Sequence, residues 1–289
     1  MEAYAQAVLN GLVLGLIYVA IAIGLTIIFG TLRLVNFAHG AFYAIGAYVG
    51  LVVVQSYGLG WSFVAAPLAV AVVAVVLDAA ILRNFYNREP TAQLLVTFGI
   101  ALVVQESLRL FFGGSAQQYP VPTALAAGFH LGNISYPLYR LLFALGVIVL
   151  VSLVWLFLAR TNYGLMVRAG VRDRIMVQLL GGNVRRASTI IFALGAAIAG
   201  LVGAAASPIY SVEPTTGFDF LVPSFVVVIV GGLGSFWGAV IGGILIGELQ
   251  SITTLIYAPA ANVVIYVLMA LVIILRPRGL FGQGELIRQ

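Results

Sequence analysis

The sequence contains no lysine and no cysteine, and each absence excludes a class of chemistry. Without cysteine the chain has no disulfide framework, zinc finger or thiol nucleophile. Without lysine it has no Walker A phosphate-binding loop, so the usual route to ATP hydrolysis is closed. It holds only two histidines and no His-Glu-x-x-His, Gly-x-Ser-x-Gly or spaced cluster of metal ligands. We therefore predict no catalytic site, metal site or cofactor in this chain.

Charge is scarce as well. Only 8% of the residues are charged and 62% are hydrophobic, whereas soluble domains are about 25% charged and about 45–50% apolar. This small number of charged residues cannot cover the surface of a water-soluble protein. We therefore expect an integral membrane protein in contact with the lipid bilayer. The net charge of +5 comes from arginine alone. In a membrane protein, arginine indicates the sidedness of loops and not nucleic-acid binding.

The charges divide the chain into apolar runs that fit membrane-spanning helices of about 20 residues. No basic segment precedes the first run, which predicts a retained span and not a cleaved signal peptide. The run 219–233 is too short to cross easily and is a candidate re-entrant segment. The fold class is an all-α polytopic membrane protein with about 8–9 transmembrane helices, in one domain over residues 1–289. The predicted spans are 8–30, 36–55, 61–82, 92–112, 139–159, 188–209, 219–233, 235–252 and 258–276.

Arginine placement predicts the orientation. Segment 160–186 holds six arginines, and further ones follow the first span, the third span and the last span. Segment 113–138 holds none. Because arginine favours cytoplasmic loops, we expect 160–187 inside, 113–138 outside, the N-terminus outside and the C-terminus inside.

Glycine is abundant, with 33 residues, and several are spaced by four. Small residues at this spacing let helix backbones approach closely in lipid. They indicate internal helix packing or, alternatively, a subunit interface or the wall of a translocation path. The positions predicted to pack helices are Gly46, Gly50, Gly234, Gly238 and Gly242. The few charges within spans are interpreted as structural. Glu106 and Arg109 are three residues apart on one helical face and can pair. Asp78, five residues before Arg83, lies near the inner end of its span and can reach the interface, and Glu248 lies near the outer end of its segment.

Segment 160–186 interleaves apolar residues with arginines at spacings of three and four, which predicts a short amphipathic helix. Gly181-Gly182-Asn183 then ends it. Such a helix can lie on the membrane surface. It can equally dock into a groove of a cytoplasmic partner.

Four motifs resemble the LivH-type permeases, which are subunits of high-affinity branched-chain amino acid ABC importers. The first runs from Asn36 to Tyr48, as NFAHGAFYAIGAY. The second comprises Arg168-Ala169, Leu179 to Asn183, and the glycine-alanine-rich stretch 193–203. The third is 231–239, as GGLGSFWGA, and the fourth is 275–282, as LRPRGLFG. They occur in the family's order along almost the whole chain.

This resemblance implies an ABC importer permease fold and a set of partners. These are a second homologous permease subunit, two cytoplasmic ATPase subunits that carry ATP and Mg, and a periplasmic substrate-binding protein. It implies a bacterial inner-membrane location and makes 160–187 the cytoplasmic coupling loop. The residues expected to contact the ATPase are Leu165, Arg168, Ala169, Met176, Leu179, Leu180, Gly181, Gly182 and Asn183. Val177 and Gly182 depart from the family, which has alanine and a bulkier apolar residue there.

A repeated feature suggests a translocation path. Residues 39–50 and 234–247 are both glycine-rich and aromatic-bearing and both follow an interruption. Paired interrupted segments point to the substrate path in secondary transporters. Chance similarity between two apolar, glycine-rich stretches is the alternative interpretation. The candidate path residues are Asn36, His39, Tyr43, Gly234 and Ser235. The expected solute is a branched-chain amino acid, with other amino acids, urea and short amides left open. The rival function is a stand-alone secondary carrier or passive channel.

Overall fold

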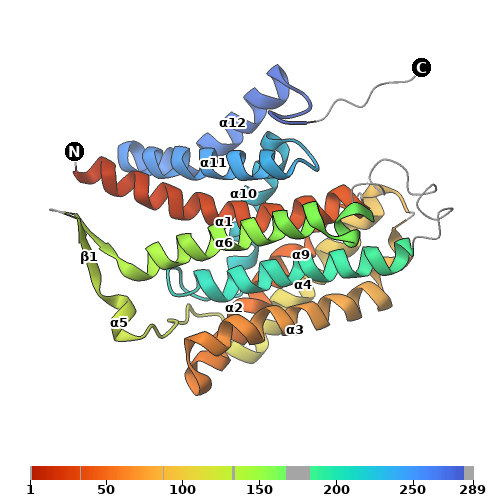
Figure 1. Cartoon of the computed structure of the whole chain (residues 1–289), viewed down its shortest axis with the longest axis horizontal. Coiled ribbons are helices and arrows are strands. Elements are labelled where there is room, and N and C mark those ends of the chain that lie inside the picture. Colours follow the sequence, from red (N-terminus) through yellow and green to blue (C-terminus); the bar gives the residue numbers. More distant parts are fainter. Residues whose placement is uncertain (1, 33, 87, 132–133, 167–182, 283–289) are drawn as a thin grey trace.

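The computed structural model describes residues 2–32, 34–86, 88–131, 134–166 and 183–282. Figure 1 shows most of the long helices lying side by side along the longest axis of the molecule. The elements are α1 (Glu2–Leu32), α2 (Ala38–Tyr57), α3 (Leu59–Ala80), η1 (Leu82–Phe85), α4 (Pro90–Phe112), α5 (Thr123–Ala126), β1 (Gly128–Leu131), β2 (Ile134–Pro137), α6 (Leu138–Arg160), α9 (Val184–Ala206), α10 (Thr216–Gly231), α11 (Phe236–Tyr257), η2 (Ala258–Ala260) and α12 (Ala261–Leu275). Residues 162–166 are helical too.

The helices confirm the predicted fold class. In the described residues, seven helical stretches are long and apolar enough to cross a membrane. The seventh, residues 236–275, comprises α11 and α12 joined by η2. The short element expected at 219–233 is α10, a helix of 16 residues with Pro223 inside it. The predicted spans therefore match the observed helices to within a few residues.

Helix α1 lies at the centre of the molecule. Its 31 residues carry no charge after Glu2, and Ile17, Val19 and Ile23 are almost completely buried on different sides of the helix. A helix that is apolar all round is a buried helix. Helices α6, α9, α10 and α11 pack around α1, so its uninterrupted apolar sequence forms the main core.

The peripheral helices expose apolar side chains instead. Val72 on α3, Leu95 on α4, Leu153 on α6 and Ile274 on α12 each expose more than half of their surface. An apolar exterior of this extent would be unstable in water, whereas it matches the hydrocarbon core of a bilayer. The structure therefore has the burial pattern of a multi-pass membrane protein.

One end of the bundle gathers the N-terminus and the segments around 113–138. Antiparallel strands β1 and β2 form a hairpin there, beside the N-terminal end of α1 (Figure 1). The Tyr136 hydroxyl donates a hydrogen bond to the Asn10 side chain at 3.1 Å, and Gln117 bridges to Val212 before α10. The sequence predicts only a loop at 113–138. Strands of four residues fall below the length at which alternation of polar and apolar residues is recognisable.

The opposite end gathers the other connections. Gly234 lies against Gly30 at the end of α1, and residues 280–281 pair with the end of α10. Buried Asp78 at the end of α3 accepts a hydrogen bond from Thr189 at the start of α9. The connections predicted to be cytoplasmic thus share one end. Which end faces the cytoplasm stays a prediction.

Cysteine labelling would test this orientation, because the chain has no cysteine of its own. Ala124 on α5 and Asn84 in η1 are both exposed, at opposite ends of the bundle. In intact cells, we expect a membrane-impermeant maleimide to label an Ala124→Cys variant. An Asn84→Cys variant should react only after the inner membrane is permeabilised. The reverse pattern would invert the predicted topology.

Candidate substrate path and coupling surface

The path residues predicted before and within α2 are buried inside the subunit. The Asn36 side chain accepts a hydrogen bond from the Ala38 backbone N–H at 3.1 Å, which shapes the entry to α2. His39 is fully buried, and a methyl group at Gly24 of α1 would lie 2.8 Å from its ring. Among the described residues, no hydrogen bond of good geometry reaches either His39 ring nitrogen, although the Ile21 carbonyl lies near the ring. Their role in a path stays a prediction.

Tyr43 belongs to an aromatic cluster around Phe220 of α10. Its ring centroid lies 5.2 Å from that of Phe220, as does the ring of Tyr210. Tyr18 of α1 contacts the same ring at 6.3 Å and donates a hydrogen bond to Gln250 of α11 at 2.7 Å. Burial raises the pKa of the Tyr210 phenol above its usual value. The cluster joins α1, α2 and α10 at an amphipathic aromatic contact.

Gly234 and Ser235 lie apart from this cluster, in the turn between α10 and α11. Gly234 has a φ of +80° and is exposed. The Ser235 side chain accepts a hydrogen bond from the Gly238 N–H at 3.1 Å and caps α11. Gly234 is thus outside any helix, so of the predicted packing residues Gly234, Gly238 and Gly242 only the last two lie on α11.

The remaining glycines predicted to pack helices do lie at close helix contacts. A Cβ on Gly46 would lie 2.2 Å from the Gly200 carbonyl oxygen of α9, and one on Gly50 would lie 2.7 Å from the Ala204 Cβ. A Cβ on Gly238 would lie 2.2 Å from the Gly231 oxygen. The contact at Gly242 is looser, at 3.2 Å. All of these contacts are within the subunit.

Two further close contacts were not predicted. Gly40 of α2 faces Gly217 of α10, where added methyl groups would lie 2.4 and 2.3 Å from the opposing carbonyl oxygens. Gly203 of α9 likewise faces the Tyr43 carbonyl. Helix α10 is therefore held against α2 at Gly40 and, through Phe220, at Tyr43. Gly40, Gly203 and Gly217 have no other glycine four residues away, so the glycine spacing did not indicate these contacts.

The C-terminal segment 276–282 covers the other end of α10. The Leu280 and Phe281 N–H groups donate hydrogen bonds to the Val230 and Gly231 carbonyls at 2.8 and 3.0 Å. These are carbonyls of the last turn of α10, which have no partner within the helix. Gly279 and Gly232, both with positive φ, meet so closely that a Cβ on Gly279 would lie 2.6 Å from the Gly232 Cα.

Comparison with known proteins identifies the family of this chain. Residues 7–275 match the family described as "Branched-chain amino acid transport system / permease component". The chain belongs to this family of permease components. It is 28% identical to the permease protein BraD of Pseudomonas aeruginosa, over 98% of this chain and 97% of that one. It is 28% identical to the permease protein LivH of Escherichia coli K12, over 98% of this chain and 96% of LivH. LivM of the same strain is 27% identical, over 92% of this chain and 68% of its own.

The predicted coupling loop, residues 160–187, lies mostly outside the described residues, which end at Met166 and resume at Asn183. Leu165 is 58% exposed in the helical turn that begins the loop. The Asn183 side chain accepts a hydrogen bond from the Arg186 N–H at 3.0 Å and caps α9. The other expected contact residues, Arg168, Ala169, Met176, Leu179, Leu180, Gly181 and Gly182, belong to 167–182.

Beside this loop, Asp78 ties three elements of the permease together. Its carboxylate lies 3.5 Å from the Arg83 guanidinium, accepts a hydrogen bond from Thr189 at 2.7 Å, and accepts another from Tyr86. Since its side chain is fully buried, losing the charge would leave these donors poorly satisfied. The predicted structural role agrees with this arrangement, although the carboxylate was expected to reach the interface and is instead buried among these partners.

Asp78→Asn is expected to destabilise the permease by about 1–2 kcal/mol, because charge-assisted hydrogen bonds are replaced by neutral ones. The matched control is Glu106→Gln, which removes the charge from an exposed pair with Arg109 at 3.8 Å. Exposed pairs contribute about 0–1 kcal/mol. Thermal unfolding in detergent should show a clear decrease for Asp78→Asn alone. Equal unfolding temperatures for the two variants would contradict a structural role for Asp78.

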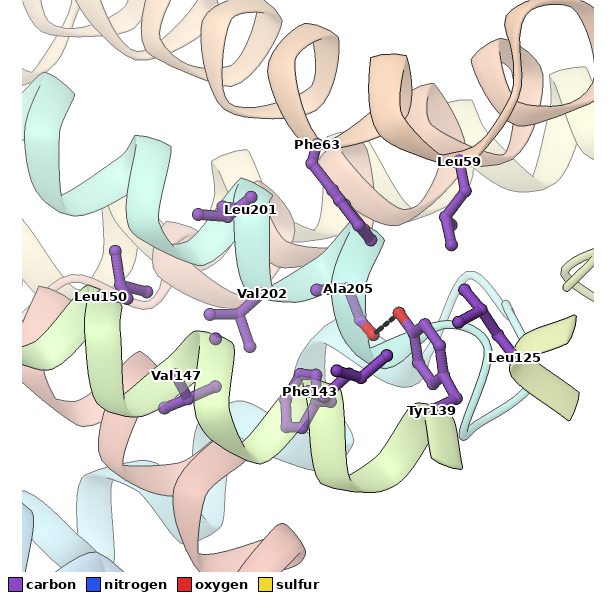
Figure 2. A pocket seen from close by; sticks show the side chains of 12 residues that line it. Leu59, Phe63, Leu125, Tyr139, Phe143, Val147, Leu150, Leu201, Val202 and Ala205 are labelled. Carbon is purple, nitrogen blue, oxygen red and sulfur yellow. Dashed lines mark hydrogen bonds between the residues drawn. The ribbon is translucent and has the colours of Figure 1, made fainter. Parts of the chain in front are cut away.

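A cavity of about 230 Å³ lies between α3, α5, α6 and α9 (Figure 2). Its lining is almost wholly apolar, and the one hydroxyl, on Tyr139, donates a hydrogen bond to the Ala205 carbonyl at 2.6 Å. An amino acid carries an ammonium and a carboxylate, which require polar partners when buried. The cavity therefore does not suit the charged groups of such a solute, and we do not assign it to the path. It is lined by Leu59, Phe63, Leu125, Tyr139, Leu142, Phe143, Gly146, Val147, Leu150, Leu201, Val202 and Ala205.

Proposed function

We propose that this permease subunit carries branched-chain amino acids, or related small amino acids and amides, across the bacterial inner membrane as part of an ABC importer. The observation that supports it is the family match over residues 7–275. Its relatives BraD and LivH, which it resembles over nearly their whole length, are named as high-affinity branched-chain amino acid permeases.

The importer would contain a second, homologous permease. LivH and LivM of one Escherichia coli strain are both relatives of this chain, and both are named as permease proteins for branched-chain amino acids. This supports a pair of related permeases. Two cytoplasmic ATPase subunits carrying ATP and Mg, and a periplasmic binding protein, would complete the importer. The lack of lysine supports an external source of ATP hydrolysis, since a P-loop needs one.

Reconstitution into proteoliposomes tests the proposal. The permease pair, the ATPase subunits and the binding protein should take up labelled leucine, isoleucine or valine only when ATP and Mg are supplied on the ATPase side. The permease alone should hydrolyse no ATP above a detergent blank. Uptake by this subunit alone, driven by an ion gradient or by the solute gradient, would favour the secondary carrier or channel. Uptake of urea or amides in place of leucine would change the solute class.

A further inference from the structure

The cavity of about 230 Å³ lies in a gap between two peripheral helices, α3 and α6. Helix α3 packs against α9 and α6 packs against α1, whereas α3 and α6 form no extensive contact in the described residues. Their side chains face each other across the gap, with side chains of α9 between them (Figure 2). Leu142 and Gly146 of α6 belong to the lining and are exposed, so the cavity reaches the outer surface of the subunit.

The cavity extends along the helices. On α6 its lining begins at Tyr139 and ends at Leu150, which corresponds to a rise of about 16 Å at 1.5 Å per residue. The hydrocarbon core of a bilayer is about 30 Å thick, so each leaflet contributes about 15 Å. The cavity therefore has the length of the hydrocarbon region of one leaflet and runs in the direction of its acyl chains.

Exposed aromatic side chains mark the level at which the cavity begins. Tyr57 and Trp61 are 72% and 64% exposed, and they flank Leu59, the first α3 residue of the lining. Tyrosine and tryptophan are enriched where the bilayer meets water. Leu59 and Tyr139 lie at the same end of the cavity (Figure 2), so this end is near the interface and the Leu150 end is near the middle of the bilayer.

The chemistry of the lining selects a hydrocarbon ligand. Among the described lining residues, the one side-chain hydroxyl is that of Tyr139, and it already donates a hydrogen bond to the Ala205 carbonyl. Apolar cavities of this kind hold no ordered water. A polar headgroup or a charged solute would be buried there without partners, at a high cost in free energy. An acyl chain has no polar group to satisfy along its length.

A helix of a second permease subunit does not fit into the same space. With its side chains an α-helix is about 10–12 Å across, so a stretch as long as the cavity is far larger than 230 Å³. Helices that meet closely in lipid do so at small residues. Apart from Gly146, the exposed α6 residues around the cavity are bulky, as at Leu142, Leu145 and Val149. We propose that this cavity binds one acyl chain of a membrane phospholipid, whose headgroup lies at the Leu59 end.

Photolabelling locates the chain. The permease is reconstituted in vesicles of phosphatidylethanolamine that carries a diazirine on one acyl chain, and labelled residues are identified by mass spectrometry. Label is expected on Leu201 or Ala205 of α9, which line the cavity, and on Leu95 of α4, which is 74% exposed and reports the surrounding lipid. Label on Leu95 without label on α9 would overturn the proposal. So would an α9 label that disappears when the second permease subunit is added, because that subunit would then cover the cavity.

Gly146→Leu is expected to fill the cavity without pushing the helices apart. Nothing lies within 4 Å of a Cβ at Gly146, so the new side chain has room. This variant should lose the α9 label and keep the label on Leu95. Gly99→Leu is the matched control, since Gly99 also has open space around its Cβ but does not line the cavity. Equal α9 labelling of Gly146→Leu and the parent, or an equal loss in Gly99→Leu, would contradict the site.

Native mass spectrometry distinguishes a bound lipid from the lipid that surrounds any membrane protein. After purification in detergent, the parent and Gly99→Leu should each retain one phospholipid per subunit, and Gly146→Leu should retain none. If the parent retains none, the cavity exchanges freely with the bilayer and is not a binding site. A size-exclusion profile that matches the parent's establishes that Gly146→Leu is folded before either measurement.

This inference goes beyond the proposed function and does not depend on the transported solute. It requires only that the chain spans a bilayer, so a permease for urea or a stand-alone carrier should give the same labelling. Failure of leucine uptake would therefore leave the acyl-chain site standing. A cavity that holds no lipid would likewise leave the proposed function standing.

Discussion

Replacing Gly46 with leucine is expected to abolish accumulation of the folded permease. The hypothetical Cβ of residue 46 lies 2.2 Å from the Gly200 oxygen and 2.4 Å from the Gly200 Cα, so even the first added carbon meets α9 backbone. Backbone cannot rotate away as a side chain can, so α2 and α9 must separate. Overpacking a core costs about 1–3 kcal/mol for small insertions, and a whole isobutyl group at a backbone contact should exceed this.

The matched pair of alanine variants makes the test quantitative. Gly46→Ala should lower the unfolding temperature, whereas Gly99→Ala on α4 should leave it unchanged or raise it. Nothing lies within 4 Å of a Cβ at Gly99, and alanine favours a helix over glycine by about 0.8–1 kcal/mol. Because the two variants should change the unfolding temperature in opposite directions, the comparison separates the effect of helix propensity from the effect of packing. Fluorescence-detected size exclusion after heating would measure both. A Gly46→Leu permease of normal yield and stability would refute the close contact.

The same contact illustrates what sequence can and cannot predict. The four-residue spacing of Gly46 and Gly50 predicted a helix surface that approaches another closely, because this spacing places both residues on one face. It could not identify α9 as the neighbour. The same spacing was misleading at Gly234, since a positive φ and the Ser235 cap break the helix there. A spacing rule assumes a continuous helix, which glycine itself can interrupt.

Long apolar runs were easier to predict than long-range contacts. The charge-free run 3–32 predicted α1, since each residue in lipid must satisfy its backbone within a helix. Arg83 stands five residues after Asp78, but their ion pair was not predicted, and neither was the hydrogen bond from Thr189, because 111 residues separate Asp78 from Thr189. The pairing of residues 280–281 with α10 uses backbone N–H groups, which every sequence carries. No pattern of side chains in the sequence therefore indicates this pairing.

In the predicted coupling loop, residues 160–187, we expect a change of two residues to have the largest functional effect. Leu179→Asn with Leu180→Asn is expected to abolish ATP-driven uptake while membrane insertion stays normal. Both residues lie in 167–182, so the expectation rests on the sequence pattern and the proposed function. Because this chain lacks the lysine of an ATP site, the proposed importer would receive its energy through a cytoplasmic surface of the permease. The loop 160–187 combines length, apolar residues and arginines in the way a docked helix requires.

The magnitude follows from burial. Removing a Leu side chain from water contributes roughly 1.5–3 kcal/mol, so loss of two could weaken ATPase binding by about a hundredfold or more, each 1.4 kcal/mol being tenfold. Leu233→Asn, at an exposed position in the α10–α11 turn, is the control for polarity at this end of the bundle. ATPase co-purification and substrate-stimulated hydrolysis are the measurements. If the loop instead lies on lipid headgroups, polar substitutions that keep its charge should be tolerated. If the double variant binds the ATPase and transports leucine as the parent does, residues 179–180 are not the coupling contact, and the energy enters elsewhere.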